Sequence, residues 1–363
     1  TKPDTPSNPT TPDDPKGKNP GDVSALEKII KEQNSKGAKL PADLNAKFTL
    51  RYNDDGEEFL DGVGYQWDEN GRLIGIRWSN CAMSGSLDLS ELTALTKLDC
   101  GCNWLSSLDV SGATALTYLN CYSNQLSSLD VSNNTALVRL WCSENQLSRL
   151  DVSGATALTE LNCFSNQLSR LDVSGATALT KLWCESNQLS SLDVSNNTAL
   201  EWLYCSSNQL SSLEIKQNTA LTELSCYRNK LSRLDVSGAT ALTWLYCYSN
   251  QLSSLDVSNN TALTELDCSE NQLSRLDVKQ NTALTDLRCS SNQLSSLDVS
   301  NNTALKWLSC KNNQLRSLNV SKNTALEMLW CSENKLSSLD VSKNTALEYL
   351  DRDYDVQLTG WPR

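Results

Sequence analysis

The sequence predicts a repeat solenoid of the α/β type that is mostly β, and three observations carry this prediction. Twelve of the 14 cysteines follow one another at intervals of 21 residues. Around each cysteine two apolar side chains alternate with variable ones, the period-two pattern of a strand with one buried face. A unit this short cannot bury its own core, so we expect the units to stack into one rod, with parallel strands about 4.8 Å apart. The twelve cysteines are Cys100, Cys121, Cys142, Cys163, Cys184, Cys205, Cys226, Cys247, Cys268, Cys289, Cys310 and Cys331.

The composition excludes several classes of function. The chain has 363 residues, no histidine and a formal net charge of −12. An acidic chain is a poor match for the phosphate backbone, so we expect no nucleic-acid binding. Without histidine there is no imidazole base or Ser-His pair, and no insertion breaks the repeat to form a pocket, so we expect no enzyme. No run approaches the roughly 18 apolar residues of a membrane span, and any secretion signal is expected to lie outside this sequence.

The repeated pattern L-x-x-L-x-C-x-x-N-x-L resembles that of the leucine-rich repeat family. It covers residues 95–346 as twelve copies, preceded by a 22-residue variant over residues 73–94, so the repeats are expected to fill residues 73–346. Residues 347–363 are expected to form a degenerate last repeat and a C-terminal cap. The short second half of each copy, L-x-x-L-D-V-S-x-x-T-A, resembles the 21-residue class of bacterial surface proteins, including internalin-like adhesins. The resemblance implies a right-handed coil with its parallel sheet on the concave face and short turns or irregular segments on the convex face.

The segment before the repeats is predicted to hold a spacer and a cap. Residues 1–22 are rich in Pro, Thr, Asp and Lys, a composition typical of a disordered spacer. Residues 23–72 are expected to form an N-terminal cap with one amphipathic helix. In that helix Ser24 and Glu27 have the spacing of a capping box, and Gly37 is expected to end it.

Three further columns of the repeat are interpreted as structural. The Asn column from Asn103 to Asn334 is expected to bond backbone groups where the chain leaves the sheet. The buried Cys column is expected to act as a row of small apolar side chains. The Asp of L-D-V-S is expected to cap the following turn, although Ca²⁺ bound between coils is an alternative interpretation. We therefore expect no metal and no cofactor.

Two cysteines lie outside the regular column. Cys81 occupies the Asn place of the irregular first coil, and Cys102 lies at a surface-facing place of the next coil. Adjacent rungs are close enough for a disulfide between them, whereas the differing side-chain directions at these places favour two separate thiols. Both interpretations stay open at this point.

Aromatic side chains gather in three of the 21 columns. Within residues 95–346, 13 of the 14 aromatic residues lie in these columns, where random placement would put about two. The columns flank the buried Leu and Cys on the strand, so their side chains are expected to leave the sheet on its concave face, together with mixed charges. The predicted ligand-binding residues are Tyr118, Tyr122, Trp141, Phe164, Trp183, Trp202, Tyr204, Tyr227, Trp244, Tyr246, Tyr248, Trp307 and Trp330.

These columns favour a non-enzymatic recognition or adhesion module that binds a protein or peptide partner through its concave face. One alternative is a glycan-binding surface protein, because Trp and Tyr faces stack on sugar rings. Another is a structural spacer array without a specific ligand, in which the aromatics only stabilise one another across strands. The family resemblance implies a secreted or cell-surface bacterial protein, and we expect a monomer.

Overall fold

The computed structural model describes residues 17–52 and 58–361. Residues 1–16 of the spacer predicted for residues 1–22 lie outside the described residues. The chain divides into two compact units, residues 1–137 and residues 138–363. This division differs from the segment boundaries proposed from the sequence, which remain a prediction. Both units are built from stacked coils, and the mostly β solenoid with one helix and parallel strands is confirmed.

The helix and strands of the first unit all precede residue 121. They are α1 (Pro20–Ser35), β1 (Thr49–Tyr52), β2 (Glu58–Asp61), β3 (Gly64–Trp67), β4 (Leu73–Arg77), β5 (Ser84–Asp88), β6 (Lys97–Asp99), β7 (Trp104–Asp109) and β8 (Tyr118–Asn120).

The second unit contains strands alone among its described residues. They are β9 (Arg139–Trp141), β10 (Glu160–Asn162), β11 (Lys181–Trp183), β12 (Trp202–Tyr204), β13 (Glu223–Ser225), β14 (Trp244–Tyr246), β15 (Glu265–Asp267), β16 (Asp286–Arg288), β17 (Trp307–Ser309), β18 (Met328–Trp330), β19 (Ser338–Asp340), β20 (Tyr349–Asp351) and β21 (Gln357–Thr359).

Helix α1 begins upstream of the capping box proposed from the sequence. The side chain of Asn19 accepts from the backbone N–H groups of Gly21 (3.0 Å) and Asp22 (3.1 Å). Pro20 occupies the first turn, where its missing N–H costs nothing. The Ser24 capping box is therefore wrong, and residues 20–22 belong to the helix and not to a spacer. The Asp22 carboxylate is buried and accepts from the Arg72 guanidinium at 2.8 Å, which fixes the first turn to the strand region.

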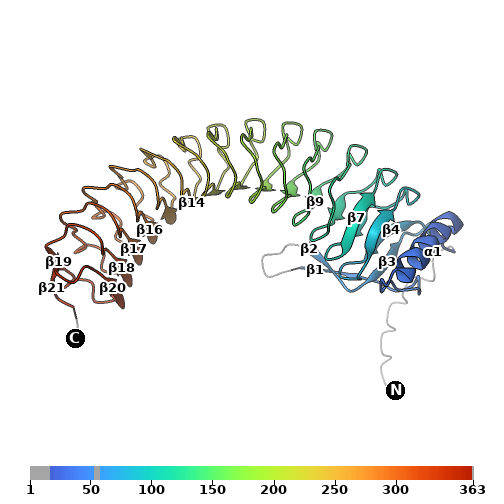
Figure 1. Cartoon of the computed structure of the whole chain (residues 1–363), viewed down its shortest axis with the longest axis horizontal. Coiled ribbons are helices and arrows are strands. Elements are labelled where there is room, and N and C mark those ends of the chain that lie inside the picture. Colours follow the sequence, from blue (N-terminus) through green and yellow to red (C-terminus); the bar gives the residue numbers. More distant parts are fainter. Residues whose placement is uncertain (1–16, 53–57, 362–363) are drawn as a thin grey trace, which may run out of the picture. The chain divides into compact units, whose positions relative to one another are not determined.

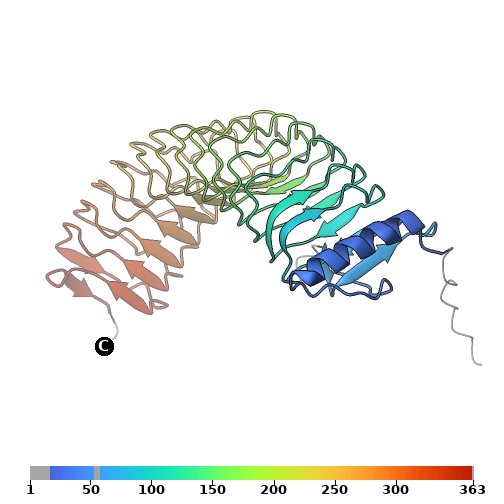
Figure 2. The same cartoon turned by 45° about the vertical axis from the view of Figure 1, so that its right-hand side comes forward.

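The buried face of α1 packs on the start of the solenoid in the first unit (Figure 2). Leu26 and Ile30 are buried, and the Gln33 side chain donates to the carbonyl of Ser86 on β5 at 2.8 Å. The helix ends at Ser35, and Gly37 follows with a φ of +98° that favours glycine. The predicted helix end is confirmed, and the N-terminal cap over residues 23–72 remains a prediction.

Strands of three different sheets accompany the helix in the first unit. Strand β3 pairs antiparallel with β4, and β4, β6 and β8 continue in parallel. Strands β5 and β7 pair in parallel behind them, and β1 and β2 form an antiparallel hairpin. The irregular first coil buries Ile76, Trp78, Cys81 and Met83, as its alignment with the repeat predicts.

The second unit is a parallel sheet with an unbroken register. Strands β9 to β18 pair in chain order and β20 pairs with β18, with each residue opposite its counterpart 21 positions away. Within this unit the strands line the inner side of the arc and the turns line its outer side (Figure 1). Each strand from β9 to β18 has three residues, and its central Leu is buried. The flanking residues therefore face the concave side, because successive side chains of a strand point to opposite faces.

The Cys and Asn columns connect neighbouring coils. All twelve column cysteines are fully buried. The Asn208 side chain donates to the carbonyls of Cys184 (3.0 Å) in the preceding coil and Cys205 (3.1 Å) in its own, and it accepts from the N–H of Leu189 at 2.9 Å. The predicted backbone role of the Asn column is confirmed.

The turns on the outer side contain a second Asn column that the sequence analysis missed. The Asn197 side chain donates to the carbonyls of Val173 (3.0 Å) and Ala176 (2.7 Å) in the preceding coil. Its Oδ1 atom is buried and has no hydrogen-bond partner among the described residues. The Asp column behaves as predicted, since Asp193 accepts from the N–H of Ser195 at 2.9 Å. The members of the second column are Asn134, Asn197, Asn218, Asn260, Asn281, Asn302, Asn323 and Asn344.

We predict that Asn208→Leu lowers the free energy of unfolding by about 1–3 kcal/mol, because it leaves buried backbone groups without partners. Denaturant unfolding followed by circular dichroism measures the loss. Gln209→Leu is the control, since the Gln209 side chain is exposed one position along the same coil. Equal effects of the two changes would contradict the structural role of the Asn column.

The residue before each Asn of the inner column has a left-handed backbone. In residues 102–333 these positions have φ between 51° and 56°, and none is glycine. We predict that Ser291→Val lowers the free energy of unfolding by about 1 kcal/mol relative to Ser291→Asn, since a β-branched side chain clashes in this conformation. Asn312 holds the same place in the next coil, so the Asn variant is a matched control. Equal stability of the two variants would show that the backbone adjusts.

Candidate functional site

The predicted binding residues lie on or directly after the strands of the inner sheet. Tyr118 and Tyr122 belong to the first unit, and the other eleven belong to the second. Tyr118 is only 8% exposed, which corrects its assignment as a contact residue. The ring of Tyr122 lies over Gly101, where a Cβ would come within 2.5 Å of it. The remaining eleven define the concave aromatic surface of the second unit: Trp141, Phe164, Trp183, Trp202, Tyr204, Tyr227, Trp244, Tyr246, Tyr248, Trp307 and Trp330.

None of these eleven side chains is sunk in the core. Nine are half-buried, and Trp244 and Trp307 are exposed at 39% and 41%. The strand pairing aligns their columns rung by rung, so that Trp202, Glu223, Trp244 and Glu265 are successive neighbours. The surface therefore presents ring faces and charges side by side on one open wall.

Part of this surface is held by contacts between its own rings. Trp183 meets Trp202 edge-on, with ring centroids 6.0 Å apart and an interplanar angle of 83°. The Lys181 ammonium lies 4.0 Å from the centroid of the Trp202 ring. Tyr227 and Tyr248 stack with centroids 4.4 Å apart and planes at 7°. Such contacts stabilise neighbouring strands and also fix the rings in place.

The tyrosine hydroxyls are used within the sheet. The hydroxyl of Tyr204 donates to the Glu223 carboxylate, and that of Tyr246 donates to Glu265. Burial raises the pKa of both tyrosines, and the hydrogen bonds to the two carboxylates raise it further. These two side chains therefore offer mainly their ring faces to a partner.

Glu185 is a half-buried acid in the third aromatic column, one of the mixed charges expected on the concave face. It directly follows the buried Cys184, and burial raises its pKa from 4.5 to about 7. Its Oε2 atom is buried without a hydrogen-bond partner among the described residues. The alternation of buried and open positions could not reveal this, because burial here depends on the neighbouring aromatic rings.

We predict that Glu185→Gln raises the free energy of unfolding above neutral pH. The native state takes up the proton more readily than the unfolded chain, so the wild type loses stability as the pH rises from 4.5 to about 7. At about pH 8 the variant should be more stable by roughly 2–3 kcal/mol, and the gain should vanish below the ordinary pKa. Denaturant unfolding over this range measures the difference. The control is Glu201→Gln, an exposed acid, and a gain of equal size there would contradict the explanation.

The disulfide between Cys81 and Cys102 is not formed. All 14 cysteines are thiols in the structure. The buried Cys81 directs its sulfur to the carbonyl of Ser79, and Cys102 directs its own to the Tyr122 hydroxyl at 2.7 Å. The two side chains thus point to different partners, in agreement with the second of the two interpretations.

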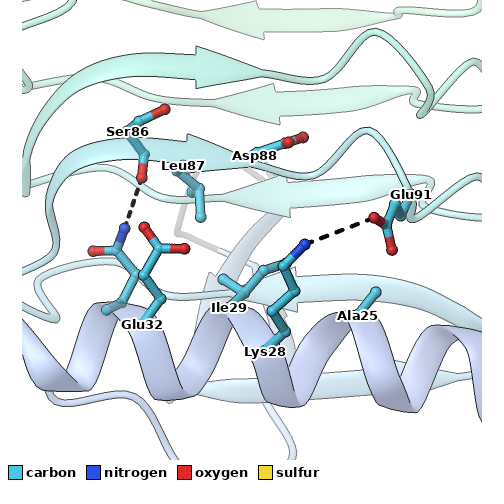
Figure 3. A pocket seen from close by; sticks show the side chains of 9 residues that line it. Ala25, Lys28, Ile29, Glu32, Ser86, Leu87, Asp88 and Glu91 are labelled. Carbon is cyan, nitrogen blue, oxygen red and sulfur yellow. Dashed lines mark hydrogen bonds and ion pairs between the residues drawn. The ribbon is translucent and has the colours of Figure 1, made fainter.

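Two cavities among the described residues of the first unit were not expected from the sequence. One of about 90 Å³ lies between α1 and β5, where Lys28 faces Glu91 at 3.9 Å (Figure 3). It is smaller than the roughly 300 Å³ of an ordinary ligand pocket. The other, of about 480 Å³, is lined by Phe48, Tyr65 and Trp67. The Tyr65 hydroxyl and the Trp67 indole N–H donate to loop carbonyls of the cap, which gives both rings a structural role.

The described residues contain neither a candidate metal site nor a candidate membrane-spanning helix. In residues 17–52 and 58–361, no cluster of three or more Cys, Asp or Glu side chains could hold a metal ion. No helix of that part of the chain is long and apolar enough to cross a membrane.

Solved structures share this architecture, although no protein-family model and no curated protein matched the chain. The functional domain of InlJ from Listeria monocytogenes, described as including a cysteine ladder, is 39% identical with a TM-score of 0.75. The match covers 79% of this chain and 64% of that domain. The chain is a leucine-rich repeat protein. Its Cys column is a cysteine ladder, and its 21-residue repeats are of the bacterial class.

Two further structures extend the comparison. The leucine-rich repeat protein LIC12759 of Leptospira interrogans is 26% identical, with a TM-score of 0.64 and coverage of 69% of both chains. An internalin, InlF, of Listeria monocytogenes shares the fold at 21% identity, with a TM-score of 0.62 and coverage of 80% of this chain and 87% of its own. These matches confirm the leucine-rich repeat fold expected from the sequence.

Proposed function

We propose that this leucine-rich repeat protein is a recognition module without enzymatic activity, which binds a protein or peptide along the concave aromatic surface of the second unit. One observation carries the proposal: eleven ring-bearing side chains share one open wall, and none is fully buried. Exposed aromatic residues mixed with charges are the composition of protein-binding surfaces.

The form of the surface also favours a large partner. The register runs without interruption from β9 to β18, at about 4.8 Å per rung. An extended wall of this kind encloses no small molecule, whereas a protein or peptide can cover many rungs at once. Rings such as Trp202 and Tyr227 are already held by their neighbours, so ordering them on binding costs little side-chain entropy.

Two observations bear on the alternatives. The stacked pair Tyr227 and Tyr248 has the geometry of simple cross-strand packing, as a spacer array requires. Trp244 and Trp307 are harder to explain by packing alone, because 39% and 41% of their surfaces stay exposed. Their open faces also suit a sugar ring, so a glycan array on the purified protein separates the glycan alternative from the protein one.

We also propose a bacterial cell-surface or secreted location and a monomeric state. The similarity to the InlJ domain and the acidic, membrane-span-free described chain support the location. The chain spans 64% of that domain, so its partner and its place in the cell are open to experiment.

We predict that Trp202→Ala and Tyr246→Ala each weaken binding to a partner isolated from host extracellular proteins by about tenfold or more, as truncation of central aromatic contacts does. Surface plasmon resonance measures the change, and thermal unfolding verifies that each variant folds. Trp104→Ala is the matched control, since Trp104 is 60% exposed but lies outside the three aromatic columns. Unchanged affinity in both concave variants would overturn the proposal.

A further inference from the structure

Three carboxylates lie together on the concave face between two exposed tryptophans. Glu265 on β15 follows Trp244 in the first aromatic column, and Asp286 on β16 precedes Trp307. Asp267 lies in the second column of β15, beside Arg288. At about 4.8 Å per rung, the two tryptophans are roughly 14 Å apart, with the acids between them. We call Glu265, Asp267 and Asp286 the acidic patch.

The acidic patch is only partly neutralised. Arg288 bonds one oxygen of Asp286 at 2.5 Å. Lys311, on the next rung, forms an ion pair with Glu333 instead, with its Nζ atom 3.1 Å from Oε1. The three acids therefore have one cation among them on the concave columns of β15 and β16.

The carboxylate of Asp286 is a separate indication that the patch lacks a hydrogen-bond donor. The residue is only 5% exposed, and its Oδ1 atom is buried with no hydrogen-bond partner among the described residues. A buried carboxylate oxygen without a partner is costly, and a positively charged donor is the group that stabilises it best. Burial also raises the pKa of Asp267 and of Asp286, although the charge of Arg288 opposes the shift.

We propose that the stretch of the concave aromatic surface between Trp244 and Trp307 is a subsite for an arginine side chain of the bound peptide. This inference rests on the proposed function and names the chemistry of the partner. A guanidinium can donate to the half-buried Glu265 and Asp267, with its charge close to the buried Asp286, while its flat face lies against an exposed indole ring. Lysine supplies the charge but not the planar fork, so it should bind more weakly. Charge complementarity thus selects a basic peptide segment as the occupant.

The test uses the full chain and short unstructured peptides in which glycine alternates with arginine, lysine, glutamine or glutamate. Binding is followed by tryptophan fluorescence and by calorimetry at near-physiological salt. The arginine peptide should bind more tightly than the lysine peptide, and the glutamine and glutamate peptides should bind at least about tenfold more weakly.

Asp286→Asn should weaken binding of the arginine peptide about tenfold, because it removes one of the three negative charges that attract the guanidinium. Its matched control is Asp298→Asn, which changes the net charge equally but lies on the outer turn of the same coil. Asp298 accepts from the N–H of Ser300 at 3.0 Å, and Asn319 makes the same bond to Ser321 in the next coil at 3.0 Å, so the control should fold. It should change the affinity less than twofold, since the turn lies away from the peptide.

Trp307→Thr provides a second variant that leaves all charges in place, and it should weaken the arginine peptide severalfold. If Asp286→Asn does not fold, the affinity of the Trp307→Thr variant for the arginine peptide tests the subsite in its place. Equal losses in Asp286→Asn and Asp298→Asn would mean general attraction to an acidic protein and would overturn the subsite, as would equal binding of the glutamine peptide. If Trp202→Ala weakens a natural partner while the peptides show no such selectivity, the proposed function stands and this inference fails.

Discussion

The structure depends on one constraint: no single coil can bury its own apolar side chains or pair its own backbone groups. A 21-residue turn of the solenoid leaves apolar side chains and backbone groups open on both sides, and only the next turn covers them. The amide of Asn208 shows how tightly this is arranged, because it bonds the carbonyl of Cys184 and the N–H of Leu189, both in the preceding coil. The spacing of the repeat is therefore fixed by hydrogen-bond geometry as well as by packing.

The same constraint creates the candidate binding surface. Because the register never shifts in the second unit, a residue type at one position of the repeat becomes a straight column on one face. The interior positions must stay Leu and Cys, and the turn positions must supply caps. The positions flanking the central Leu are free of both demands, so chemical variety collects there, in rings and charges on the concave side.

Much of this arrangement could be read from the sequence, and the exceptions have physical causes. The Leu, Cys and inner Asn columns follow from periodicity, and the structure confirms all three. The start of α1 was misplaced because a Ser-x-x-Glu spacing also occurs inside helices, and Asn19 with Pro20 is the stronger signal.

Other features depend on neighbours that sequence spacing does not encode. The burial of Tyr118 and the displaced pKa of Glu185 arise from the particular side chains on adjacent rungs. The outer Asn column was hidden because Asn-Asn-Thr reads as a polar turn, although the second Asn of each triplet is fully buried. The wall of aromatic rings could be located from the sequence, whereas the internal hydrogen bonds of its tyrosines could not.

The cysteine ladder has a practical consequence for studying this molecule. Every regular coil contains one inaccessible thiol, and burial holds the pKa of groups such as Cys184 and Cys268 well above the ordinary value. A thiol reagent can modify such a group only after its own coil has opened. Labelling followed by mass spectrometry would therefore measure how readily each coil opens, with the protein's own cysteines as reporters.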